Sequence, residues 1–289
     1  MNPFQSEGEF DLIRRIETAA RRGASRPGVV LGIGDDAALL QPPTGWMVVV
    51  TTDMLMDGRH FMLAEHGAVV AGVKAMGVNL SDLAAMAALP WAAFVSVALP
   101  RTSAIGDIHS IAHDLLKGIR RVSEEFQVAL TGGDTNAWNG PLVVSITLLG
   151  LVESDPPGAI LRSGAQPGDT IAVTGPLGGS ILGRHLRPQP RINEARTLRN
   201  HLNLHALIDL SDGLASDLRR LSEASKGWGI ELDEAAIPIH DDARTLARTT
   251  RRSPLEHALN DGEDFELCLT TPETLDPARL ANLPTPLIP

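Results

Sequence analysis

Residues 68–99 read AVVAGVKAMGVNLSDLAAMAALPWAAFVSVAL, and a change of pattern inside this stretch indicates the fold class. Apolar residues first recur every three or four positions, which is typical of a buried helix, and we expect a break near Asn79. The continuous apolar run after Pro90 is typical of a buried strand. We therefore predict a helix, a turn at Leu89 and Pro90, and a strand. A membrane span is not expected, because residues 83–99 fall short of the roughly 20 apolar residues that cross a bilayer.

The same alternation of patterns continues on both sides of this stretch. Helix-like and strand-like segments follow one another at residues 9–22, 46–53, 105–126, 128–134 and 142–152. A segment rich in Pro, Gly and Ser follows at residues 153–169. After it, helix-like and strand-like segments alternate again in a second series. We predict an α/β (α+β) fold of two α/β domains, residues 1–153 and 154–289. Because the second series stops after LPTPLIP without a closing strand, we expect the C-terminal domain to be incomplete.

Composition narrows the class of protein and the kind of ligand. The chain has 289 residues, 43% hydrophobic content, mean hydropathy +0.02 and a formal net charge of −10. An acidic chain without a basic stripe is not expected to bind nucleic acid. The N-terminus has no basic and apolar signal-peptide pattern, and the single cysteine, Cys268, fits a reducing compartment as a core residue. We therefore expect a cytoplasmic protein that does not bind a membrane.

Residues 31–38, LGIGDDAA, carry a glycine loop with an unusual charge. The spacing G-x-G-x-x-A is that of a dinucleotide-binding turn, which lays a pyrophosphate on a helix N-terminus. Asp35 and Asp36 would repel such an anion. Either the match is accidental or metal ions lie between the carboxylates and the phosphate.

Other acidic residues follow strand-like runs in the same way. With their neighbouring small and hydroxyl residues, the full set of acidic turns is Asp35 and Asp36, Thr51, Thr52 and Asp53, Asp82, Gly132, Gly133, Asp134 and Thr135, Asp209 with Ser211 and Asp212, and Glu263 with Asp264. Strand ends of an open α/β sheet meet at one rim, so we expect these side chains to converge there. Oxygen-only ligands indicate Mg²⁺ or Ca²⁺ rather than zinc, and the D-x-D-x-D-G spacing of a calcium loop is absent. The sequence therefore predicts that metal ions held here meet a phosphate.

One short pattern occurs in both halves of the chain. NLSDLAA at residues 79–85 and DLSDGLA at residues 209–215 each place Leu-Ser-Asp where we expect a helix to begin. Ser and Asp are favoured N-cap residues, so capping is one interpretation of each copy. Two copies, one in each half, also favour a shared site.

Several other chemistries are not expected, because the motifs that they require are absent from the sequence. No G-x-x-x-x-G-K-[ST], H-R-D or D-F-G occurs, so neither a P-loop nor a protein-kinase site is expected. A dinucleotide fold stays possible for LGIGDDAA, since Asp53 and Asp57 lie about twenty positions on. No G-x-S-x-G or Cys–His pair indicates covalent catalysis. His60, in DGRHF, is the histidine most suited to a site, although an isolated loop histidine has an ordinary structural interpretation.

Seven motifs in order closely resemble the bacterial thiamine-monophosphate kinase family: LGIGDDAAL, TTDMLMDGRHF, NLSDLAAM, LTGGDT, LRSGAQPGDTIAVTG, IDLSDGLASDL and GEDFELC. The resemblance covers residues 7–270 and implies two α/β domains. It also implies a homodimer formed through the sheet of the N-terminal domain, with ATP in a cleft near that interface. The implied reaction moves the γ-phosphoryl group of ATP to thiamine monophosphate, giving thiamine diphosphate and ADP.

The resemblance also implies roles for particular residues. The metal ligands, for several Mg²⁺ ions per site, would be Asp36, Thr51, Thr52, Asp53, Asp82, Asp134, Asp209 and Asp212. Gly133, Arg162 and Ser211 would contact ATP, and His60 and Glu263 would contact thiamine monophosphate; Asp35 is a weaker candidate. No general base is assigned, because a phosphate monoester with a second pKa of about 6 is already ionised at neutral pH.

Two alternatives to this function are retained. One is another ATP-using member of the same superfamily, similar to selenophosphate synthetase, whose reactive N-terminal cysteine this chain does not match. The other is a non-catalytic module that binds a nucleotide and Mg²⁺ through the same acidic residues.

Overall fold

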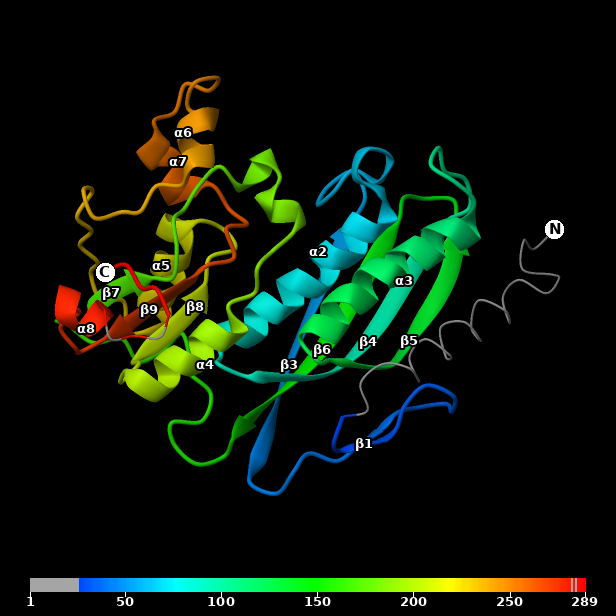
Figure 1. Cartoon of the computed structure of the whole chain (residues 1–289), viewed down its shortest axis with the longest axis horizontal. Helices are drawn as coiled ribbons and strands as arrows, with labels where there is room; N and C mark the ends of the chain where they lie inside the picture. Colours follow the sequence, from blue (N-terminus) through cyan, green and yellow to red (C-terminus); the bar gives the residue numbers. More distant parts are fainter. Residues whose placement is uncertain (1–25, 282, 284) are drawn as a thin grey trace. The chain divides into compact units, whose positions relative to one another are not determined.

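The protein folds as two compact units in a computed structural model that describes residues 26–281, 283 and 285–289 (Figure 1). The N-terminal unit contains the described residues up to Asn79 together with residues 90–151. The C-terminal unit contains residues 80–89 and the described residues from Val152 onward. The helix expected at residues 9–22 lies outside the described residues. The prediction of an α/β fold is confirmed.

The N-terminal unit is built on a four-stranded sheet in the order β3-β6-β4-β5. Its elements are β1 (Val29–Leu31), β2 (Leu39–Leu40), β3 (Trp46–Met56), α2 (Leu63–Ala85), β4 (Leu89–Pro100), α3 (Ile108–Glu125), β5 (Ala129–Trp138) and β6 (Val143–Glu153). β4 and β5 are parallel, and β1 and β2 form a small antiparallel pair. Alternate residues of β6, including Val144, Ile146 and Leu148, are fully buried, as expected where one face of a strand meets the core.

Helices α2 and α3 run side by side across this sheet (Figure 1). The N-cap of α3 is Asp107, whose side chain accepts hydrogen bonds from the backbone N–H groups of His109 and Ser110. The two helices approach closely where each has a glycine. A Cβ at Gly72 would lie 2.3 Å from the Leu115 carbonyl oxygen, and one at Gly118 would lie 2.0 Å from the Val69 carbonyl oxygen. Backbone contact of this kind requires glycine on both helices.

The prediction of a break near Asn79 is wrong. α2 continues to Ala85, and the Asn79 side chain donates a hydrogen bond to the Ala75 carbonyl oxygen at 2.9 Å inside the helix. The helical geometry is interrupted at Gly67, whose φ of 76° favours glycine. Leu89 and Pro90 begin β4 instead of forming the turn, because α2 already ends before Ala87, which has a positive φ of 53°.

Helix α2 is the one helix of the described chain with the length and hydropathy of a membrane span, and 72% of its most apolar window is buried inside the structure. Met76, Leu80 and Leu83 are completely buried. This burial is typical of a core helix.

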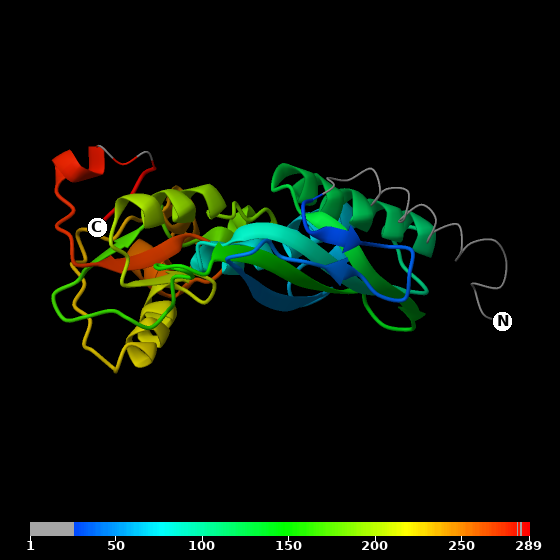
Figure 2. The same ribbon diagram turned by 90° about the horizontal axis from the view of Figure 1, so that it is seen from below.

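The C-terminal unit contains a three-stranded antiparallel sheet in the order β7-β9-β8. Its elements are β7 (Thr170–Val173), α4 (Ile192–His201), β8 (Ala206–Asp209), α5 (Leu214–Ala224), α6 (Asp241–Leu246), α7 (Pro254–Asn260), β9 (Leu267–Thr271) and α8 (Pro277–Ala281). Two short 3-10 turns follow β7, at Ser180–Leu182 and Arg184–Leu186. Figure 2 shows this sheet and its helices from a second direction.

The core of this unit lies between the sheet and α5. Ile208, Leu218 and Leu221 pack there together with Cys268. Cys268 is completely buried, and burial raises the pKa of its thiol to about 12. The prediction that this cysteine is a core residue is confirmed.

The glycine contact between α2 and α3 generates a stability prediction. We expect Gly118→Ala to lower the free energy of unfolding by about 2 kcal/mol or more, because the added Cβ forces the helices apart. This loss outweighs the roughly 1 kcal/mol that alanine gains in helix propensity. Chemical denaturation measures the difference. Gly229→Ala is the control, since a Cβ there meets nothing within 4 Å; an equal effect of both changes would contradict the prediction.

Candidate functional site

A cavity of about 800 Å³ lies within the N-terminal unit, and the LGIGDDAA loop forms one of its walls. The loop residues 32–38 face residues 94–97 of β4, residues 130–135 of β5 and apolar side chains of α3. This volume is within the range of small-molecule sites in proteins. Three carboxylates line the cavity, those of Asp35, Asp36 and Asp134.

The two aspartates of the loop differ in their local contacts. Asp35 Oδ1 accepts a hydrogen bond from the Asp36 backbone N–H at 2.8 Å, so Asp35 stabilises the turn of its own loop. Gly34, with a φ of 126°, supplies a conformation that other residues rarely adopt. The loop thereby presents the exposed Asp36 at the cavity.

Asp134 and the glycines before it lie in the middle of β5, although we expected the strand to end there. A Cβ at Gly132 would lie 2.7 Å from the Phe94 ring, and one at Gly133 would lie 1.9 Å from the Val95 carbonyl oxygen. Both glycines therefore permit a close approach of β4 and β5. Asp134 is exposed, and its Oδ2 accepts a hydrogen bond from Asn136 Nδ2 at 2.7 Å.

Thr51, Thr52 and Asp53 also lie inside a strand, β3, and not at its end. β3 and β5 occupy opposite edges of the sheet, about 14 Å apart at three strand spacings. Thr52 Oγ1 instead lies 3.1 Å from the hydroxyl of Thr147 on β6. The expected convergence of these residues with Asp134 does not occur within one chain.

His60 is placed by a tight turn between β3 and α2. Its Nδ1 accepts a hydrogen bond from the Met56 backbone N–H at 3.0 Å, and its carbonyl oxygen accepts one from Lys74 Nζ at 2.7 Å. Lys74 is completely buried in α2. The sequence analysis assigned no role to this lysine. A lysine inside an apolar helical stretch is the sequence signal that could have found it, because a buried lysine needs a hydrogen-bond partner.

In the C-terminal unit the two Leu-Ser-Asp patterns come together. Ser81 Oγ donates a hydrogen bond to Asp209 Oδ2 at 2.8 Å. Asp209 ends β8 and is 2% exposed, and its pKa is raised to about 7, first by burial and then by the charge of Asp82. Arg162 acts in the opposite direction. The first pattern lies inside α2, so the expectation that it begins a helix is wrong, whereas the second directly precedes α5.

The loop after β8 is held by Asp217, which the sequence analysis did not single out. Asp217 is buried on α5, and its Oδ2 accepts a hydrogen bond from the Asp212 backbone N–H at 2.9 Å. Arg220 forms ion pairs with the carboxylates of both Asp212 and Asp217. An acidic residue in the first turn of a helix is the sequence signal that could have found Asp217.

Ser211 and Glu263, predicted for different substrates, are neighbours in the structure. The Glu263 backbone N–H donates a hydrogen bond to the Ser211 carbonyl oxygen at 2.8 Å. A Cβ at Gly262 would lie 2.6 Å from the same oxygen, so glycine is needed at this approach. Glu263 and Asp264 precede β9, so they do not follow a strand as expected.

These carboxylates suit Mg²⁺ better than a metal that needs a complete protein cage. Among the residues that the structure describes, no group of three or more His, Cys, Asp and Glu side chains could hold a metal ion. Mg²⁺ needs only one or two carboxylates, because waters and substrate phosphates complete its coordination. Asp209 is buried against the charge of Asp82, and an adjacent cation would offset both the burial and the repulsion.

Comparisons with known proteins show what the whole chain is similar to. The family model described as AIR synthase related protein, N-terminal domain, matches residues 34–152. The thiamine-monophosphate kinase of Rhodopirellula baltica is 45% identical over 255 residues, which cover 85% of this chain and 78% of the relative. The crystal structure of thiamine-monophosphate kinase from Stenotrophomonas maltophilia has a TM-score of 0.79 and 34% identity, covering 97% of this chain and 92% of the other. A structure of AaThiL complexed with AMPPCP and TMP has a TM-score of 0.74 and 28% identity, covering 97% and 89%.

The burial of Asp209 generates a prediction for the metal-free protein. The folded chain retains a proton on Asp209 between about pH 4 and pH 7, whereas the unfolded chain releases it, so this residue lowers stability as pH rises through that window. We expect Asp209→Asn to remove this loss. In EDTA-treated protein, the stability of the variant relative to the original chain should rise between pH 5 and pH 8, by about 2–4 kcal/mol at most.

Thermal denaturation at several pH values measures this difference. The exposed Asp155, changed to Asn, is the control and should show no comparable trend. A constant difference between Asp209→Asn and the original chain from pH 5 to pH 8 would contradict the prediction.

Proposed function

The chain belongs to the thiamine-monophosphate kinase family, and from this premise we propose that it transfers the γ-phosphoryl group of ATP to thiamine monophosphate by direct in-line displacement with several Mg²⁺ ions. The observation that carries the proposal is the carboxylate of Asp209, buried beside the charge of Asp82 and given the hydroxyl of Ser81 as a donor. A site that brings negative charges together in this way is suited to cations that meet phosphate.

The proposed metal ligands lie on separate elements. They are Asp36 and Asp134 at the cavity of the N-terminal unit, Asp82, Asp209 and Asp212 in the C-terminal unit, and Thr51, Thr52 and Asp53 on β3. When bound there, Mg²⁺ would neutralise phosphate charge and hold two anions in line. Asp212 would first have to exchange its ion pair with Arg220.

The remaining residues orient the two substrates. We assign Gly133, Arg162 and Ser211 to ATP, where the exposed Arg162 offers a guanidinium group to phosphate. His60 and Glu263 are assigned to thiamine monophosphate. The acceptor phosphate is largely ionised at neutral pH, so the chain needs no general base to activate it. A cytoplasmic location fits these substrates and the single free cysteine.

A homodimer through the N-terminal sheet is part of the proposal. β3 is an edge strand, and an unusual number of its apolar side chains are exposed: Met47, Val48, Val50, Met54 and Met56. An exposed apolar edge strand favours pairing with another chain. A second copy seated there would cover these side chains and place Thr51, Thr52 and Asp53 at the interface.

Product analysis tests the reaction. With ATP, MgCl₂ and thiamine monophosphate, we expect thiamine diphosphate and ADP in equal amounts, and EDTA should abolish both. Chromatography resolves the products. ADP without thiamine diphosphate would indicate another acceptor, and ATP binding without ADP would indicate a non-catalytic module; either result contradicts the proposal.

A charge-removing substitution tests the metal assignment. We expect Asp134→Asn to lower kcat by about 100-fold or more with little change in melting temperature, because an exposed ligand is lost and no buried contact is disturbed. Steady-state kinetics over a range of MgCl₂ concentrations measure the effect. Asp155→Asn is the matched control, and activity equal to that control would refute the role of Asp134.

The homodimer is tested at the exposed edge. We expect Val50→Asp to shift the protein toward monomer in sedimentation velocity, because a charge at an apolar interface cannot be solvated. Ile181→Asp, at a similarly exposed apolar residue of the C-terminal unit, is the control and should leave the oligomer unchanged. A dimer that survives Val50→Asp as well as the control would place the interface elsewhere.

A further inference from the structure

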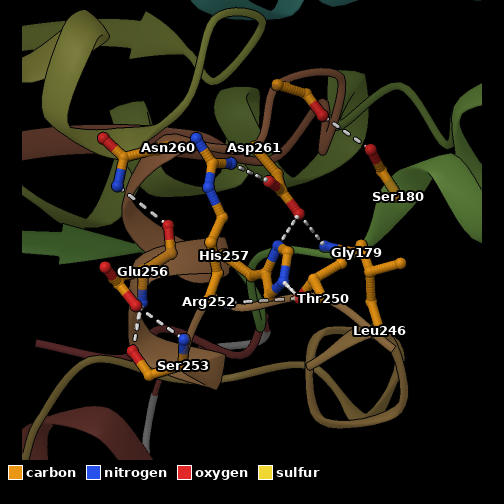
Figure 3. Close-up of polar contacts among 12 residues, drawn as sticks. Gly179, Ser180, Leu246, Thr250, Arg252, Ser253, Glu256, His257, Asn260 and Asp261 are labelled. Carbon is orange, nitrogen blue, oxygen red and sulfur yellow. Dashed lines mark hydrogen bonds and ion pairs between the residues drawn. The ribbon is translucent and has the colours of Figure 1, made fainter. Parts of the chain in front are cut away.

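His257 on α7 is a buried histidine with hydrogen-bond partners at both ring nitrogens (Figure 3). It is 2% exposed; its Nδ1 lies 2.9 Å from Asp261 Oδ2 and its Nε2 lies 2.8 Å from Thr250 Oγ1. An ionised carboxylate only accepts hydrogen bonds, so Nδ1 carries the proton. In the neutral ring, Nε2 then accepts a hydrogen bond from the Thr250 hydroxyl. The two partners thus select one tautomer and one ring orientation.

Asp261 connects this histidine to a glycine turn. The same Oδ2 accepts a hydrogen bond from the Gly179 backbone N–H at 2.9 Å, and Arg252 lies 3.5 Å from Oδ1 (Figure 3). Asp261 is also the C-cap residue directly after α7. His257 therefore holds the carboxylate that links the end of α7 to the turn before Ser180.

The segment that follows Asp261 is tethered on both sides of Glu263. On one side, Ser180 Oγ donates a hydrogen bond to the Gly262 carbonyl oxygen at 2.6 Å. On the other, Asp264 Oδ2 accepts one from the Gly178 backbone N–H at 2.8 Å. Successive N–H groups of Gly178 and Gly179 are therefore bound by two carboxylates, one before and one after Glu263.

These tethers act on a strained residue. Glu263 has a φ of 61°, in the left-handed region that residues other than glycine rarely adopt. Such a conformation persists only where surrounding contacts hold it. Its backbone N–H reaches the Ser211 carbonyl oxygen in this conformation, and the direction of its side chain follows from the same φ.

We propose that His257 is a positioning residue that acts through Asp261 to hold Glu263 in its left-handed conformation for thiamine monophosphate. The inference rests on the proposed role of Glu263 in substrate binding. His257 does not touch substrate. Because Glu263 is assigned to thiamine monophosphate, we expect the effect of His257 to fall mainly on the apparent affinity for this acceptor.

Stabilisation of α7 alone does not explain this histidine. α7 begins with a capping box, in which the Ser253 side chain accepts a hydrogen bond from the Glu256 backbone N–H and the Glu256 side chain accepts one from the Ser253 backbone N–H. The helix start is therefore held without His257. The histidine acts at the other end, where the loop to Glu263 begins.

Two substitutions at position 257 separate its hydrogen bond from its volume. His257→Leu keeps apolar volume but cannot donate to Asp261, whereas His257→Asn places an amide N–H near the position of Nδ1. We expect His257→Leu to raise KM for thiamine monophosphate by about tenfold, with kcat and KM for ATP within twofold of the original chain. His257→Asn should restore most of the affinity.

A double change tests whether the effect passes through Asp261. Asp261→Ala should raise the same KM to a similar extent, and adding His257→Leu to it should produce no further increase. Because Asp261 is partly exposed, this variant also serves if His257→Leu does not fold. Additive effects of the two changes would overturn the proposal.

Ser253→Ala is the matched structural control, because it removes the cap of the same helix and leaves the pair of His257 and Asp261 intact. It should lower the melting temperature without changing KM for thiamine monophosphate. If Ser253→Ala raises this KM as much as His257→Leu does, the role is merely structural and the proposal fails.

Hydrogen exchange at the Glu263 amide gives a readout that does not depend on activity. We expect faster exchange in His257→Leu and exchange at the original rate in His257→Asn and Ser253→Ala, because only the first change releases the segment that holds this N–H on Ser211. Unchanged exchange in His257→Leu overturns the positioning role. Glu263→Gln with unchanged KM, in protein that still forms thiamine diphosphate, overturns instead the assignment of Glu263, while absence of all product refutes the proposed kinase reaction.

Discussion

The hydrogen bond between Ser81 and the buried carboxylate of Asp209 connects residues 80–89, which come from the first half of the chain, to the sheet of the C-terminal unit. The bond joins the last turns of α2 to the end of β8. The other described residues of this unit come from Val152 onward in the sequence. A buried carboxylate beside a second one is unfavourable for folding by itself. The arrangement is therefore suited to a cation. By themselves, the two carboxylates lower the stability of the fold at the place where the chemistry is proposed to occur.

The acidic motif GEDFE shows how neighbouring carboxylates divide into different roles. Glu263 lies beside Ser211, whereas Asp264 is buried between the Gly178 backbone N–H and Arg184, with burial raising its pKa to about 6. Glu266 accepts two hydrogen bonds from Arg191 and one from Thr174. Buried ion pairs of this kind contribute little net stability, but removing one partner leaves an uncompensated charge. Two of the three acids thus hold the loop from which the third is presented.

The limits of prediction are clearest in α2 and in the strands. Asn79, Ser81 and Asp82 looked like a helix boundary because these residue types favour caps, yet burial of Met76, Leu80 and Leu83 keeps the helix continuous through them. Asp134 was expected where a strand ends, yet β5 continues through it, and Gly132 and Gly133 occur where β4 and β5 come too close for a Cβ. Lys74 and Asp217 were not found, because their roles depend on backbone groups that only the fold brings to them.

The sequence by itself determined the fold class, the family and the acidic character of the motifs, because apolar periodicity and the types of residues in each motif are local properties. Tertiary structure alone decided which carboxylates meet. Strand order separates Asp53 from Asp134, the packing of the last turns of α2 brings Ser81 to Asp209, and His257 reaches Glu263 through Asp261. The physical reason is that hydrogen bonds and charge interactions act over a few ångströms, and the pairs of residues at that distance are set by packing and not by sequence order.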